Sequence, residues 1–168
     1  YLTVDLGAMR FETGQMPSGI QSKTILLSSL LPFQINYDDW KLYNLDESVA
    51  EDWNQISFDD STWLVRKASA FGTSEAITVY VRRIVSVPNI EDYQVLNVRV
   101  RYTGGIAAYF NGRLVARFNL EDSFNKDSTS LGLHDANTFS VFHVILPIAG
   151  GITGNNVIGF EVHRPVGT

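Results

Sequence analysis

Hydrophobic and polar residues alternate with a period of two in several stretches of the chain, as they do in half-buried β-strands. The clearest stretch is residues 95–102, where apolar side chains alternate with Asn97, Arg99 and Arg101. Residues 157–164 repeat the pattern. In this stretch, one set of alternating positions is apolar, and the other set includes a glutamate and a histidine. Both stretches therefore predict strands with one face against a core.

A tight hairpin is predicted within Tyr102–Phe118, where two β-prone runs are joined by Asn111-Gly112. This pair suits a two-residue turn in which both central residues have positive φ. Such a turn fixes the register of the strand that follows it. In the strand after the turn, we expect one face to carry Leu114, Ala116 and Phe118 and the opposite face to carry Arg113 and Arg117.

Other segments complete a β-rich pattern. Residues 33–43 and 77–87 read as strands, and residues 139–148 are so apolar that we expect both faces of this strand to be covered. Residues 46–54 have the spacing of one short helical turn. Residues 119–137 form a long polar stretch without periodicity, and loops of this length inside compact domains are often functional.

Many short strands with almost no helix predict an all-β fold, an antiparallel β-sandwich of jelly-roll type. The ten Phe, seven Tyr and three Trp agree with this, because aromatic side chains suit pleated, half-buried surfaces. We expect two parts. Residues 1–32 form an extended N-terminal segment or linker, or the end of a neighbouring module, and residues 33–168 form the jelly-roll domain.

Charge and composition exclude several classes of partner. The net charge of −5 and the lack of a basic stripe argue against nucleic acid. No apolar stretch is long enough to span a bilayer, so we expect no membrane insertion. No cysteine is present, which excludes disulfides and thiolate chemistry. Because the chain starts at Tyr1, we expect it to be a piece of a longer polypeptide.

The sequence offers little for catalysis. It has three histidines without His-Glu-x-x-His spacing, no Gly-x-Ser-x-Gly motif and no phosphate-binding loop. The adjacent pairs Asp38-Asp39 and Asp59-Asp60 cannot flank one glycosidic bond at the required separation. We expect these pairs to cap turns and the chain not to be an enzyme.

Five fragments, taken in order, resemble the galactose-binding-like jelly-roll domains that accompany glycoside hydrolases and other extracellular proteins. They are Trp40–Tyr43, Phe58–Trp63 (Phe-Asp-Asp-Ser-Thr-Trp), Tyr80–Arg83 (Tyr-Val-Arg-Arg), Ala108–Arg117 around the Asn-Gly turn, and Asn156–His163. The resemblance covers roughly residues 33–164.

The resemblance implies a non-catalytic, lectin-like accessory module that binds a glycan. Its parent would be a larger extracellular or cell-surface protein with several domains. The alternative is a purely structural or protein-interaction β-sandwich that braces neighbouring domains or subunits. Fold alone does not decide between them.

Sugar sites combine an aromatic platform with a few fixed polar groups. Residues near the hairpin and in the long loop provide both kinds of side chain. The candidates are Tyr109, Phe118, Asn119, Asp122, Asn125, His134 and Asp135. In the alternative interpretation, the aromatic residues pack the hairpin and the loop residues are simply solvated.

The resemblance also implies one structural calcium, with a glutamate of the closing strand among its ligands. Glu161 matches that position, and Asp46 or Asp60 would join it. The alternative is that Glu161 forms an ion pair with Arg164 or Arg99.

The remaining motif residues have structural roles. We expect Trp40 in the core and the turn of residues 58–63 anchored by Phe58 and Trp63. Arg82 and Arg83 are adjacent and must point to opposite faces of a strand. Whichever is buried needs a carboxylate, and the nearest candidates are Asp59 and Asp60.

Overall fold

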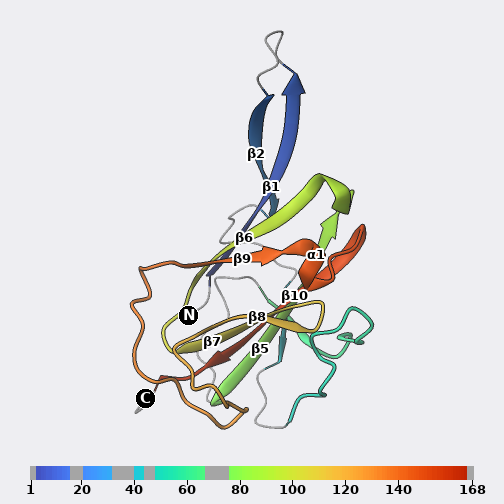
Figure 1. Cartoon of the computed structure of the whole chain (residues 1–168). Helices are drawn as coiled ribbons and strands as arrows, with labels where there is room; N and C mark the ends of the chain where they lie inside the picture. Colours follow the sequence, from blue (N-terminus) through green and yellow to red (C-terminus); the bar gives the residue numbers. More distant parts are fainter. Residues whose placement is uncertain (1–2, 16–20, 32–39, 44–47, 67–75, 166–168) are drawn as a thin grey trace.

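The computed structural model describes residues 3–15, 21–31, 40–43, 48–66 and 76–165, with side chains described from Trp40 onward. Within these ranges the chain forms two antiparallel sheets that face each other (Figure 1). The predicted all-β antiparallel sandwich is confirmed. No helix among the described residues is both long and apolar enough to cross a membrane.

The larger sheet has six strands in the order β4-β3-β5-β10-β7-β8. Their bounds are β3 Trp40–Tyr43, β4 Leu64–Arg66, β5 Thr78–Val87, β7 Gly105–Phe110, β8 Arg113–Phe118 and β10 Gly154–His163.

The smaller sheet has four strands in the order β2-β1-β6-β9. Their bounds are β1 Thr3–Gln15, β2 Gln21–Leu31, β6 Tyr93–Arg101 and β9 Ser140–Ile145. Two short helices, η2 (Ile90–Asp92) and α1 (Leu146–Ala149), lie at the ends of β6 and β9.

The core lies between the sheets and follows the predicted alternation. Leu96, Val98 and Val100 of β6 are fully buried against Ile158 and Phe160 of β10. Each fully buried side chain of this size contributes about 2 kcal/mol. Other strands add to the same cluster, among them Trp40, Leu42, Val81, Val85, Ile106, Ala108, Phe110, Phe142 and Val144.

The N-terminal strands belong to the smaller sheet. β1 pairs with β6 from Thr3 to Arg10, and with β2 along almost its whole length. The β1–β2 hairpin therefore continues beyond β6 and projects from the sandwich (Figure 1). The division of the chain after residue 32 stays a prediction.

Two expectations about local structure were wrong. Residues 51–54 form turns and residues 48–50 have no regular structure, so no helix occurs here; Trp53 N is bonded to Ala50 O and Gln55 N to Asp52 O. Strand β9 is covered on one face only, because Phe142 and Val144 pack into the core between the sheets whereas the opposite face of the sheet is open to solvent. Its outward-facing Val141 and Ile145 are about half exposed, at 51% and 49%.

The hairpin of β7 and β8 also departs from strict alternation. A β-bulge follows Ala108, so that Ala108 pairs with Ala116 whereas Tyr109 pairs with Leu114. The extra residue reverses the faces of the side chains nearest the turn. Ala116 and Phe118 pack against the core as predicted, but Leu114 is 51% exposed.

Candidate functional site

The outer face of the six-stranded sheet carries a second aromatic cluster. Strand alternation directs Tyr80 of β5, Tyr109 of β7 and Glu161 of β10 away from the core, because their neighbours Val81, Ala108 and Phe160 point into it. The segment of residues 48–66 folds over this face. The cluster consists of Trp53, Trp63 and Tyr80, with Tyr43, Val49, Phe58 and Tyr109 packed against them.

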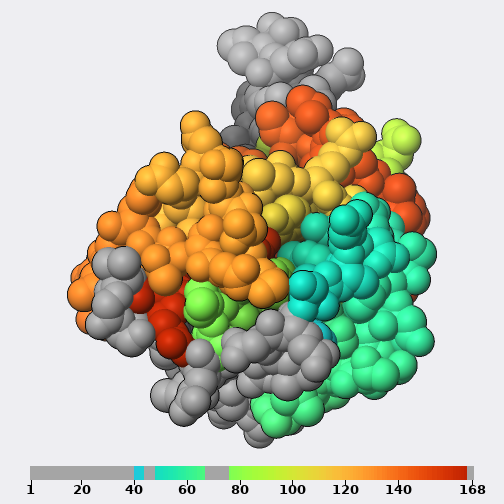
Figure 2. All heavy atoms as spheres, turned by 90° about the horizontal axis from the view of Figure 1, so that it is seen from below, coloured from blue at the N-terminus to red at the C-terminus, as the bar shows by residue number. Residues whose placement is uncertain are grey.

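The space-filling view shows a hollow at this face. The loop of residues 119–137, in orange, and the segment of residues 48–66, in teal, stand on either side (Figure 2). Red atoms of β10 and light green atoms of β5 lie deeper between them (Figure 2). Two separate segments thus flank the central strands of the sheet.

Trp53 is the centre of the cluster. Its ring contacts Tyr80 and Tyr109 edge-on, with centroid distances of 5.1 and 5.4 Å. It stacks on Trp63 at 6.2 Å. The ring can approach the sheet because residue 159 of β10 is a glycine, where a Cβ would lie 2.7 Å from Cζ3 of Trp53. The aromatic rings are therefore fixed before any ligand arrives.

A buried carboxylate lies beside these rings. Glu161 is 6% exposed and accepts a hydrogen bond from Tyr109 Oη at 3.0 Å and a longer one from Tyr80 Oη at 3.4 Å. Burial, and then the nearby charge of Glu161, raise the pKa of both tyrosines above 10.0. Both hydroxyls therefore stay protonated and serve as donors to the carboxylate.

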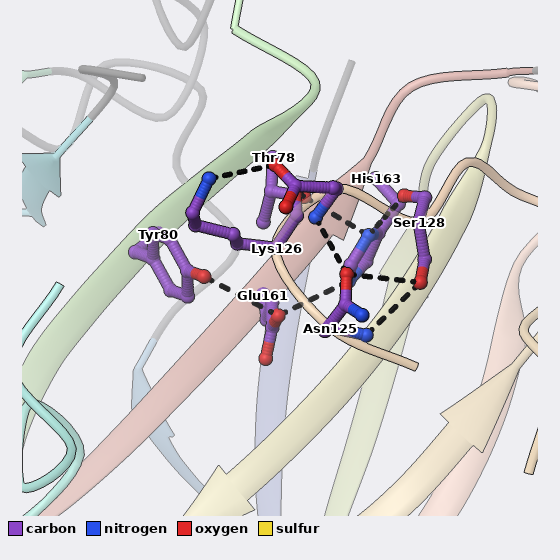
Figure 3. A network of polar contacts seen from close by, with 8 residues as sticks. Thr78, Tyr80, Asn125, Lys126, Ser128, Glu161 and His163 are labelled. Atoms are coloured by element: carbon purple, nitrogen blue, oxygen red, sulfur yellow. Dashed lines mark hydrogen bonds and ion pairs between the residues drawn. The ribbon is translucent and has the colours of Figure 1, made fainter. Parts of the chain in front are cut away.

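His163 connects Glu161 to the long loop (Figure 3). Its Nδ1 lies 2.7 Å from the carbonyl oxygen of Ser128, which can only accept, so Nδ1 carries a proton. The same nitrogen is 3.0 Å from Thr78 Oγ1, whose own hydrogen is donated to the carbonyl of Lys126 at 2.6 Å. On the other side of the ring, Nε2 lies 3.3 Å from Glu161 Oε1.

The loop of residues 119–137 is held by main-chain hydrogen bonds at several points. Ser130 N donates to Arg164 O, Leu131 N to Asn119 O and His134 N to Thr103 O, at 2.8–3.0 Å. Together with the bonds to His163 and Thr78, these contacts fix one wall of the hollow. A long polar loop was predicted here, but its attachment to β10 was not.

Most of the predicted sugar-binding side chains of the loop already have partners within the protein. Asn119 donates to Gly104 O and Gly132 O, and Asn125 and Asp135 accept from main-chain N–H groups two residues ahead. Asp122 forms an ion pair with Arg117. His134 stacks on Tyr102, with ring centroids 4.1 Å apart.

The two predicted aromatic residues differ in position. Phe118 packs against the main core, in contact with Tyr102 and Phe142. Tyr109 lies half-buried on the outer face beside Glu161. The structure therefore brings together Tyr109 and Glu161, but places Phe118 on the other side of the sheet.

Tyr80, Thr78 and His163 were not predicted to belong to this site. Tyr80 pairs directly with Glu161 across β5 and β10, and Thr78 pairs with His163. Alternation in each strand could have placed these residues on one face. The pairing of the two strands, however, has no signal in the sequence.

The predicted calcium ligands do not come together among the described residues. Asp60 faces two cations, Arg82 and Lys41, whereas Glu161 faces two tyrosine hydroxyls and His163. No group of three or more metal-binding side chains occurs in the part of the chain that is described. Asp46 lies outside it, so a calcium site that uses Asp46 stays a prediction.

Neither Arg164 nor Arg99 is needed to explain the buried state of Glu161, because tyrosine hydroxyls and His163 surround its carboxylate. The predicted pair of an arginine with a carboxylate occurs elsewhere. Arg82 is 1% exposed and is bonded to Asp60 and to the carbonyls of Gln55 and Phe58. Burial lowers the pKa of Arg82, and Asp60 opposes that effect.

The other motif residues take structural positions. Arg83 points to the opposite face, where it stacks over Trp40 at 5.7 Å. Phe58 and Trp63 contact each other at 5.6 Å and anchor the turn between them. Asn111 and Gly112 both have positive φ, 47° and 85°, as the hairpin turn requires.

Comparisons of the chain with family models, with curated proteins and with solved structures found no match.

Proposed function

We propose that this chain is a non-catalytic carbohydrate-binding accessory module of a larger extracellular or cell-surface protein. Its glycan site is the hollow between residues 48–66 and 119–137. The observation that supports this most is the pairing of a half-buried aromatic ring, Tyr109, with the buried carboxylate of Glu161 at 3.0 Å. The motif resemblance to galactose-binding-like domains favours the same function.

The chemistry of the hollow suits a sugar. The apolar face of a sugar ring packs against an aromatic side chain, and its hydroxyls need fixed hydrogen-bond partners. Tyr109 supplies the ring. Its hydroxyl donates its proton to Glu161 and keeps a lone pair that accepts a hydrogen bond from a sugar hydroxyl. Contact with Trp53 fixes the position of the ring.

The predicted loop residues take a different role in this proposal. Because Asn119, Asn125 and Asp135 are bonded within the loop, they shape the wall of the hollow. The sugar then contacts mainly Tyr109. A site with one open aromatic ring leaves much of a sugar in water, so we expect weak binding to isolated sugars.

The test is a glycan array with plant, microbial and animal sugars, followed by calorimetry with the best ligand. Tyr109→Ala should weaken binding at least tenfold, which corresponds to about 1.4 kcal/mol. Tyr109→Phe keeps the ring but loses the bond to Glu161, and should give an intermediate loss. Asp122→Asn is the matched control, because Asp122 is exposed in the loop away from this pair.

Two results would overturn the proposal. One is an array with no signal for any glycan, which would favour a bracing role for the sandwich. The other is a glycan whose affinity falls with Asp122→Asn but not with Tyr109→Ala, since the ligand would then bind the loop surface instead of the hollow.

A further inference from the structure

A groove lies where β8 and β9, the outermost strands of the two sheets, come together. It has a volume of about 520 Å³ and runs between the start of β8 and the end of β9, with α1 beside it. Its walls are mostly apolar, formed by Leu114, Val115, Val144, Ile145, Ile148 and Ala149.

Several of these side chains are unusually exposed. Ile148 of α1 is 69% exposed, Leu114 is 51% and Ile145 is 49%. Single exposed apolar residues are normal on protein surfaces, but a contiguous group that lines a groove marks an interaction site. The β-bulge after Ala108 is what turns Leu114 outward at this position.

The two strands that border the groove are both outermost strands. β8 pairs only with β7, and β9 only with β6, within the described chain. The free edge of an outermost strand presents main-chain N–H and C=O groups that another extended chain can pair with. The groove thus combines apolar walls with strand edges.

The groove has a positive charge at its rim. Arg113 lines it and is exposed, and none of the described residues that line it is a carboxylate. The chain as a whole carries a net charge of −5. One N–H of Arg113 donates to Ile148 O at 3.2 Å, and a guanidinium has five donors in all. A ligand carboxylate has complementary charge here.

We propose that this groove docks an extended segment of a partner protein in which apolar and acidic residues alternate. The apolar side chains fill the space between Leu114, Ile145 and Ile148. The acidic side chains meet Arg113 at the rim, and the backbone pairs with an exposed strand edge. This site is independent of glycan binding and does not share residues with the hollow.

The test uses two labelled synthetic peptides, one alternating valine and glutamate and the other alternating valine and lysine. Fluorescence anisotropy should show the acidic peptide binding at least tenfold more tightly. Arg113→Glu should reverse the preference, which simple loss of structure would not do. Ile148→Asp should abolish binding of the acidic peptide. Leu133→Asp is the control, because Leu133 is 77% exposed in the long loop.

The proposal fails if neither peptide binds up to about 1 mM, the weak limit of specific recognition. It also fails if both peptides bind equally or if Leu133→Asp weakens binding as much as Ile148→Asp. Sedimentation of the free chain as a dimer that Ile148→Asp dissociates would assign the groove to a second copy instead. Thermal unfolding of each variant, with Leu114→Asp as a second probe of the groove, separates lost binding from lost structure.

Discussion

Trp53 lies directly over Gly159, with so little space that a Cβ at residue 159 would be 2.7 Å from the indole ring. This contact joins the segment of residues 48–66 to the central strand of the larger sheet. It also sets the position of the tryptophan between Tyr80 and Tyr109.

Gly159→Ala should therefore destabilise the fold. The added methyl group must displace Trp53, and overpacking of this kind costs about 2 kcal/mol. Chemical denaturation measures the loss. Gly132→Ala is the control, because a Cβ there meets nothing within 4 Å, and it should leave stability unchanged or slightly raised. Equal effects of the two substitutions would show that Trp53 does not pack closely on β10.

Asp60→Asn should cost far more than Asp59→Asn. Asp60 pairs with the buried guanidinium of Arg82, and loss of its charge should reduce the free energy of unfolding by about 2 kcal/mol. Asp59 is exposed and accepts from Ser61 N, a bond that asparagine can keep. Urea denaturation distinguishes the two. If both variants unfold at the same urea concentration, the Arg82–Asp60 pair contributes nothing.

Tyr80 and Tyr109 should ionise late in an alkaline titration. Their pKa values are raised above 10.0 by burial and by Glu161. Because a raised pKa favours the protonated form in the folded state, the resulting stability is complete below pH 10 and is lost as the pH rises beyond it. Tyrosinate absorbance measures the ionisation.

Two substitutions test whether Tyr80 and Tyr109 are the groups that ionise at high pH. Tyr109→Phe should remove one group from the late-ionising fraction. Glu161→Gln should bring this fraction to lower pH, since it removes a negative charge beside both hydroxyls. An unchanged curve for both variants would place these tyrosines in contact with solvent.

Asn111→Gly should destabilise the hairpin even though glycine suits positive φ better than any other residue. The Asn111 side chain donates to Gly150 O and to Asn156 Oδ1 and accepts from Val157 N, at 2.8–2.9 Å. Loss of three bonds should cost about 2 kcal/mol. Asn111→Ala should cost roughly 1 kcal/mol more, because alanine resists the φ of 47°. If Asn111→Gly is neutral, the turn depends on its backbone alone.

The strands could be predicted from the sequence because their signal is local. The alternation in β6 and β10 and the Asn111-Gly112 turn were visible within short stretches. A buried arginine paired with Asp59 or Asp60 was also predicted, and the structure selects Arg82 and Asp60. The bulge after Ala108 was not, because the extra residue carries no distinctive side chain. Its consequence, the exposure of Leu114, was therefore missed as well.

The site was harder to predict than the fold. Tyr80 and Glu161 are 81 positions apart, and they meet only because β10 enters the sheet between β5 and β7. Tyr109 and Glu161 were predicted in two different sites, one for sugar and one for calcium. Polar groups of the loop were predicted to bind a ligand, although Asn119 is bonded to the carbonyls of Gly104 and Gly132 and Asp135 caps a local turn.

The loop between β8 and β9 is anchored through main-chain atoms at Ser130, Leu131 and His134, and at its crest a Cβ added to Gly132 would meet nothing within 4 Å. Main-chain hydrogen bonds do not depend on the identity of the side chains between them. Other residues introduced at the crest would leave the backbone of the loop in place. The side chains that a ligand meets there could therefore be changed without altering the β-sandwich.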